Sequence, residues 1–190
     1  IGRLEHAIDA LRLLCTNDEK KAYELAHKIG NVNVERQELV EKSVAEAKGS
    51  VLLRTDPIKL PKILIFVSDH WHEGIIGLIA SKIAEEFYRP TLVLTKTNEH
   101  YKGSARSIPA FHITEFLCSL KKYLIDVGGH KQAAGFTIEK EKITIFETAA
   151  LKLANKLLKD KDLEKKIEAD LKIPLEKINL SLVKSLEQLQ

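Results

Sequence analysis

The chain has 190 residues, of which 44% are hydrophobic and 30% are charged. This composition is typical of a globular protein with one good core or two modest domains, and it excludes a disordered tail. The net charge of +3 permits nucleic acid as a partner without requiring it. No apolar stretch approaches the roughly 20 residues that cross a bilayer, and no secretory signal pattern opens the chain. We therefore expect a cytoplasmic protein with no membrane contact.

The chain contains no methionine and begins Ile1-Gly2-Arg3, which predicts a fragment of a larger protein. Its two cysteines, Cys15 and Cys118, are far apart in the sequence, and each falls on an apolar helical face. We predict two buried free thiols in preference to a disulfide.

The first third of the chain is helical in pattern. Apolar residues recur at helical spacing over residues 4–14, and residues 16–19 have the form of a capping box that opens a second helix ending near Gly30. Residues 33–47 favour helix but carry only a thin apolar stripe, which is typical of a helix that bridges two domains. A Gly-Ser pair at 49–50 is predicted to end this helix, and a linker with two prolines follows.

The central part alternates strands and helices. The apolar runs at 63–67 and 91–95 predict strands, the first of them buried on both faces. Apolar residues at helical spacing predict a helix over 76–87, so these elements form a right-handed βαβ unit with parallel strands. A third extended segment over 101–108 is predicted to return antiparallel beside the second strand.

The C-terminal part is predicted to begin with a strand at 135–138. Residues 142–158 predict a helix, although 143–146 could extend a strand instead. After a charged connector, residues 167–173 alternate like a strand, and residues 180–189 are helical in pattern.

A glycine-rich loop is predicted over 128–135, after an amphipathic helix over 113–124. Its adjacent glycines permit φ > 0 and close approach to a ligand, while His130 and Lys131 offer protons or positive charge to an anion. The alternative is an ordinary turn in which Gly128 caps the preceding helix.

A second small-residue loop, Gly103-Ser104-Ala105-Arg106-Ser107, is predicted upstream. A guanidinium can contact two phosphate oxygens at once, so Arg106 and the neighbouring hydroxyls suit a phosphate. The alternative for these polar side chains is a surface strand without a site.

The densest group of possible metal ligands comprises Asp69, His70, His72 and Glu73. On a continued strand the two histidines would share a face, but a helix is predicted to start within this group and would rotate them apart. We therefore predict no metal here.

Four motifs occur in a recognisable order: Trp71 to Gly77, Arg89-Pro90, Gly103 to Ser107, and Gly128 to Gly135. This order resembles the RecJ family of single-strand-specific 5′ exonucleases, within the DHH phosphoesterase superfamily. The resemblance implies an α/β fold, namely a DHHA1-type mixed sheet with flanking helices, preceded by a long connecting helix.

The resemblance also implies how the chain is divided. Residues 1–30 would end a DHH catalytic domain, and residues 31–58 would form a connecting helix and linker. Residues 59–160 would be the DHHA1 substrate-binding domain, and residues 161–190 would begin an OB-fold domain.

Site residues follow from the resemblance. In the family pattern Trp71 packs at the strand-to-helix turn, while His72 and the helix N-terminus face the substrate side, where helix amides favour an anion. His70 falls outside this pattern and receives no role. His130 is the catalytic candidate, donating to a phosphate oxygen near the reaction centre. Arg106 with Ser104 would hold a phosphate of single-stranded DNA. The remaining candidates for phosphate or nucleic-acid binding are His72, Ser107, Gly128, Gly129, Lys131 and Arg3.

The implied activity is 5′-to-3′ exonuclease hydrolysis with two Mn²⁺ or Mg²⁺ ions, in DNA repair and recombination. The metal-binding domain is missing from the sequence, so the resemblance implies no metal in this chain and no cleavage by it alone. The implied partners are single-stranded DNA and, among proteins, a single-strand-binding protein or a helicase. Two alternatives stay open: another DHH/DHHA1 phosphodiesterase, of the oligoribonuclease or cyclic-dinucleotide type, and a non-catalytic nucleic-acid-binding module.

Overall fold

The computed structural model describes residues 7–54, 60–166 and 171–188. Its centre is a five-stranded sheet with the strand order β1-β2-β3-β5-β4, in which only β1 and β2 pair parallel. The strands are β1 (Leu64–Ser68), β2 (Thr91–Lys96), β3 (His100–Arg106), β4 (Leu124–His130) and β5 (Ala133–Glu139). The predicted α/β class and the parallel β1-α3-β2 unit are confirmed, as is the antiparallel return of β3.

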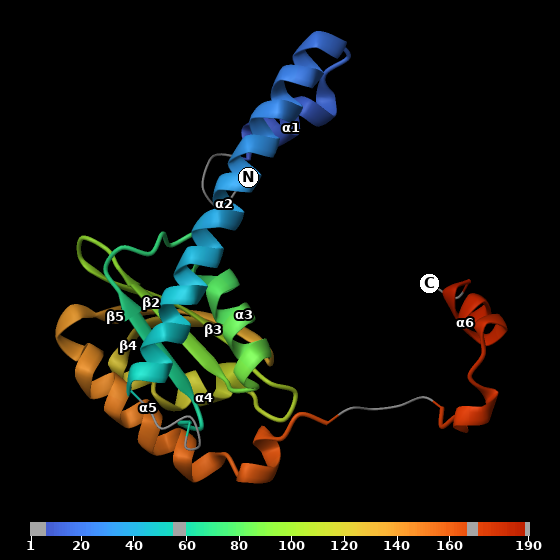
Figure 1. Cartoon of the computed structure of the whole chain (residues 1–190). Coiled ribbons are helices and arrows are strands. Elements are labelled where there is room, and N and C mark those ends of the chain that lie inside the picture. Colours follow the sequence, from blue (N-terminus) through green and yellow to red (C-terminus); the bar gives the residue numbers. More distant parts are fainter. Residues whose placement is uncertain (1–6, 55–59, 167–170, 189–190) are drawn as a thin grey trace.

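Helices cover both faces of this sheet (Figure 1). The helices that cover the sheet are α2 (Glu19–Arg54), α3 (Ile76–Phe87), α4 (Ile113–Ser119) and α5 (Ile143–Leu157). Two further helices, α1 (Ile8–Cys15) and α6 (Leu180–Glu187), lie away from it. Short 3₁₀ turns occur at η1 (Lys121–Tyr123), η2 (Lys140–Lys142), η3 (Asp160–Leu163) and η4 (Leu175–Lys177).

Two apolar clusters fill the space between the sheet and the helices. On one face, Phe66 and Val93 of the sheet pack with Ile79 of α3 and Val44 of α2. On the other face, Phe136, Ile138 and Leu92 pack with buried residues of α4 and α5, including Phe146. Burial of both faces explains why β1 and β2 are nearly continuous apolar runs.

The helix α2 runs for 36 residues without interruption, which corresponds to a length of roughly 54 Å. Its cap is Asp18, whose Oδ1 accepts from the Lys21 N–H at 3.2 Å. The predicted breaks near Gly30 and at the Gly-Ser pair are therefore wrong. A glycine ends a helix by adopting positive φ, and among the described glycines only Gly129 has positive φ.

Figure 1 shows α2 extending well beyond the sheet, with α1 against its outer part, while the segment with η4 and α6 lies apart from the sheet. The predicted helices at the C-terminus are confirmed, and 143–146 belongs to α5. Of the predicted strand over 167–173, residues 167–170 lie outside the described residues, and residues 171–173 are not in a strand.

Both predicted glycine-rich loops are strands. The segment over 103–107 belongs to β3 up to Arg106, and the residues 124–130 form β4, which begins soon after the short helix α4. The hairpin turn is at residues 131–132, between β4 and β5. The helix predicted over 113–124 is thus too long, because the chain forms the turn η1 and then enters β4, which pairs with β5.

Both cysteines are free, as predicted, but both are exposed. Cys118 follows Leu117 on α4, and Leu117 is the residue that enters the core together with Phe116. The prediction of buried thiols is wrong for two reasons: Cys118 lies just off the buried stripe of α4, and α1, which carries Cys15, buries none of its residues.

Candidate functional site

A cleft of about 640 Å³ lies between the N-terminal end of α3 and the strands β3, β5 and β4. The chain segment before and at the start of α3 forms one side of it, and the sheet forms the other. The residues used below that line it are His72, Glu73, Gly74, Gly77, Lys102, Ser104, Arg106, Asp126, Gly128, Gly135 and Thr137.

Strand register decides which side chains reach this side of the sheet. Arg106 of β3 pairs with Ala133 of β5, which in turn pairs with His130 of β4. Directly paired residues project from the same face of a sheet. Arg106 and His130 therefore lie on one face, two strand spacings or roughly 10 Å apart between Cα atoms.

The Arg106 guanidinium is held in a defined position. Its Nε donates to Ser81 Oγ at 3.1 Å, and its Nη1 donates to Ser104 Oγ at 3.2 Å and to the Ala105 carbonyl at 2.8 Å. A Cβ on Gly77 would lie 3.1 Å from Arg106 Nη2. Because Gly77 has no side chain, the guanidinium can lie against α3.

Glycines form the part of the sheet that faces the cleft. Ser104 pairs with Gly135, which pairs with Gly128, and a Cβ on either glycine would meet no atom within 4 Å. The backbone there is open to close approach by a ligand. Gly129 differs, because its φ is +150° and a Cβ would lie 2.3 Å from the Ala133 carbonyl oxygen.

His72 lies at the other side of the cleft, before α3. Its Nδ1 accepts the Gly74 N–H at 3.0 Å, so the neutral ring carries its proton on Nε2. The first N–H groups of a helix have no intrahelical acceptor, and the helix dipole favours an anion there. This end of α3 and His72 thus present donors toward the cleft.

An ion pair lines the cleft farther along β3. Lys102 Nζ lies 2.7 Å from Glu73 Oε2, and both side chains are about half exposed. The hydrogen bond from Lys102 lowers the pKa of Glu73, and the positive charge of Lys102 acts in the same direction, against the opposing effect of burial. Lys102 is therefore already paired with Glu73 when a ligand enters the cleft.

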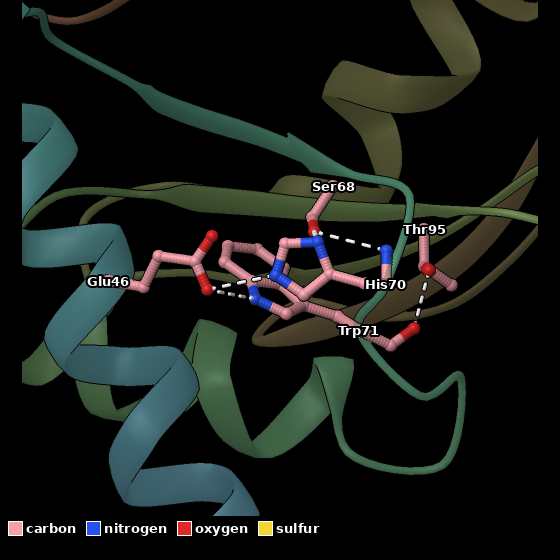
Figure 2. A network of polar contacts seen from close by, with 5 residues as sticks. All are labelled: Glu46, Ser68, His70, Trp71 and Thr95. Carbon is pink, nitrogen blue, oxygen red and sulfur yellow. Dashed lines mark hydrogen bonds and ion pairs between the residues drawn. The ribbon is translucent and has the colours of Figure 1, made fainter.

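A network around Trp71 fixes the segment that carries His72 (Figure 2). Glu46 Oε2 of α2 accepts from His70 Nε2 at 3.0 Å and from Trp71 Nε1 at 3.1 Å. Ser68 Oγ contacts His70 Nδ1 at 3.1 Å, and Thr95 Oγ1 donates to the Trp71 carbonyl. The hydrogen bonds from His70 and Trp71 lower the pKa of Glu46, the His70 bond most strongly.

The structure brings together four of the predicted site residues, because His72, Ser104, Arg106 and Gly128 all line the cleft. Gly129 and His130 continue β4 beyond it, and Trp71 is buried as predicted.

Two other predicted residues, Ser107 and Lys131, do not line this cleft. Ser107 donates its hydroxyl to the Phe111 carbonyl at 2.8 Å, and Lys131 is exposed in the hairpin turn. Arg3 lies outside the described residues.

Sequence reasoning missed several residues of this region. Glu46 precedes Trp71 by 25 positions, and no local pattern links them. Lys102 and Asp126 could have been found from the alternation along β3 and β4, had the pairing been known. Gly77 was part of a motif, but its contact with Arg106 depends on tertiary packing.

Residues 60–160 match the sequence model of the DHHA1 domain. This match covers more than half of the chain, and the chain therefore belongs to the DHHA1-domain family. The domain is of the RecJ type, and the fold resemblance predicted from the four motifs is confirmed.

Particular relatives are RecJ enzymes. The chain is 34% identical over 192 residues to the single-stranded-DNA-specific exonuclease RecJ of Bacillus subtilis strain 168, covering 100% of this chain and 24% of that protein. It is 32% identical over 146 residues to RecJ of Thermus thermophilus, covering 77% of this chain and 20% of that protein. The crystal structure of Thermus thermophilus RecJ with Mg²⁺ superposes with a TM-score of 0.72 at 31% identity, covering 82% of this chain and 24% of that one.

The chain thus spans about a quarter of the length of these relatives. Within the described ranges, no group of three or more His, Cys, Asp or Glu residues could hold a metal ion. The described residues therefore do not form a ligand set for the Mg²⁺ or Mn²⁺ named for RecJ structures. No helix in the described part of the chain is both long and apolar enough to span a bilayer.

Proposed function

We propose that the cleft binds a phosphate group of single-stranded DNA, and that the chain is the substrate-binding part of a RecJ-like 5′-to-3′ exonuclease. One observation carries the proposal. The Arg106 guanidinium is held by Ser81 and Ser104 beside open glycine backbone and against the first turn of α3 at Gly77. Fixed charge, a side-chain-free surface and helix N–H groups together suit a phosphate.

The roles of the residues follow from their positions. Arg106 and Ser104 bind the phosphate, and His72 donates from Nε2. Gly128 gives the sugar-phosphate chain room, while Gly129 shapes β4. His130 lies on the same face as Arg106 and is the candidate to donate to a phosphate oxygen during hydrolysis. Lys131, in the adjacent turn, adds positive charge, and the roles of Ser107 and Arg3 stay predictions.

For the whole enzyme we propose the division inferred from the sequence, with residues 59–160 as the substrate-binding domain between a catalytic domain and an OB-fold domain. Hydrolysis with Mg²⁺ or Mn²⁺ would use residues that this sequence does not include. The chain alone should therefore bind DNA without digesting it. DNA repair and recombination, together with a single-strand-binding protein or helicase as partner, are part of the same proposal.

The test is fluorescence anisotropy with a 5′-phosphorylated single-stranded oligodeoxythymidylate at several salt concentrations. Binding should weaken with rising salt, because each phosphate contact releases counterions. Arg106→Ala should weaken binding about 10- to 100-fold, since charged hydrogen bonds contribute roughly 1.5–3 kcal/mol.

Arg12→Ala is the matched control, because Arg12 is an exposed arginine on α1 that pairs with Asp9. Equal losses in the two variants would mean that only net charge matters, and unchanged binding of Arg106→Ala would remove Arg106 from the site. Stronger competition by a cyclic dinucleotide or oligoribonucleotide than by DNA would favour the other phosphodiesterase classes.

A further inference from the structure

Two carboxylates line a cleft that the proposed function assigns to a phosphate. Glu73 is paired with Lys102, so their charges largely cancel. Asp126 of β4 accepts the Val127 N–H at 2.8 Å, and within the described part of the chain its carboxylate makes no ion pair. An exposed carboxylate without a cation beside it is unexpected in an anion site, and the proposed function gives it no role.

The strand register places Asp126 away from Arg106. Asp126 pairs with Thr137, which pairs with Lys102, whereas Arg106 is paired through Ala133 with His130. These two rows of paired residues are four positions apart along each strand, or roughly 13 Å. Asp126 and Arg106 also belong to strands separated by β5. The cleft thus has a positively charged corner at Arg106 and a negatively charged corner at Asp126.

The glycine row lies between these corners. Because Gly128 and Gly135 carry no side chain, no steric barrier along this row stops a phosphate from sliding from Ser104 toward Asp126. Steric hindrance therefore does not distinguish the two ends, but charge does. A carboxylate repels phosphate oxygens through the same Coulomb term that draws them to a guanidinium, and a repulsive element can set specificity as well as an attractive one.

We propose that Asp126 is a specificity-determining residue that confines the phosphate to the Arg106–Ser104 end of the cleft by repelling phosphate from the β4 end. This inference rests on the proposed function. Asp126 thereby limits the cleft to one phosphate group and sets the position of the DNA strand along the cleft. Asp126 lowers affinity for polyanions in exchange for a defined binding register.

The variant Asp126→Asn tests the sign of this effect. The amide oxygen can still accept the Val127 N–H, so the fold should be kept while the charge is removed. In anisotropy titrations with 5′-phosphorylated oligodeoxythymidylate, Asp126→Asn should bind about 3- to 10-fold more tightly than wild type at low salt, because repulsion between exposed charges is modest. The slope of affinity against salt should become steeper.

Competition with inorganic anions tests the single-phosphate claim. Tripolyphosphate should displace the oligonucleotide better, relative to orthophosphate, in Asp126→Asn than in wild type. Asp69→Asn is the control, since Asp69 pairs with Lys96 and does not line the cleft. It should change the oligonucleotide affinity, and the ratio of tripolyphosphate to orthophosphate competition, by less than about twofold.

The outcomes separate the two proposals. If wild type binds in an Arg106-dependent manner and Asp126→Asn binds equally or more weakly, this inference is overturned and the proposed function stands. A weaker variant would mean that Asp126 accepts a hydrogen bond from the ligand. If wild-type binding does not depend on Arg106, the proposed function fails and the inference falls with it.

Discussion

Of the two glycines in β4, Gly129 should be the one at which a substitution destabilises the fold. Its φ is +150°, and a Cβ would lie 2.3 Å from the Ala133 carbonyl oxygen and 2.5 Å from Ala134 Cα. An L side chain in this region costs roughly 1–3 kcal/mol, and forcing an extra carbon into packed atoms costs a further 1–3 kcal/mol or so. Gly129→Ala should therefore lower the free energy of unfolding by roughly 2–6 kcal/mol.

Gly128→Ala is the matched control on the adjacent residue. Its Cβ would meet no atom within 4 Å, and alanine is favoured over glycine in a strand by roughly 0.5–1 kcal/mol. This variant should be neutral or slightly more stable than wild type.

Urea unfolding can follow both variants through the fluorescence of Trp71, which is the single tryptophan and is buried in the core between α2, α3 and the sheet. Equal unfolding free energies for Gly128→Ala and Gly129→Ala would refute the reasoning from backbone geometry.

Three other variants test stability, and one of them, Gly77→Ala, also tests DNA binding. The hydrogen bond from His70 lowers the pKa of Glu46, so the stability it provides is present above the ordinary pKa of 4.5 and is lost as the pH falls below it. Urea midpoints of Glu46→Gln should consequently change less below that pH than those of wild type. Gly77→Ala should keep or raise the melting temperature, because alanine favours helix by about 1 kcal/mol. Its new Cβ would press on Arg106, so anisotropy should show DNA binding weakened at least about threefold. Thr95→Val leaves a buried carbonyl without its hydroxyl donor and should cost about 1–3 kcal/mol in urea unfolding.

Elements whose pattern is local were predictable from the sequence. The residues 76–87 form α3 because apolar side chains recur at helical spacing, and that stripe is buried against the sheet and α2. The apolar runs of β1 and β2 were predictable for a similar reason, since strands covered on both faces carry few polar residues. The family resemblance came from short motifs in order, and those motifs lie in or beside these regular elements.

Elements decided by distant partners were not predictable in the same way. A Gly-Gly pair followed by a histidine resembles a loop, yet residues 124–130 form a strand because β5 supplies its hydrogen bonds. In the same way, Gly30 and Gly49 continue α2 with helical backbone, although each costs about 1 kcal/mol relative to alanine. The contact between Glu46 and Trp71 is a third case, because it joins elements that only the fold brings together.

The register that builds the cleft is fixed from the opposite face of the sheet. A Cβ on Gly103 would lie 2.3 Å from the ring of Phe136, so the ring lies directly over this glycine. Gly103 and Phe136 are paired across β3 and β5, next to the pair of Ser104 and Gly135 that faces the cleft. A slip of one residue would turn every side chain of β3 to the other face. The packing of Phe136 in the core therefore also keeps Arg106 directed toward the cleft.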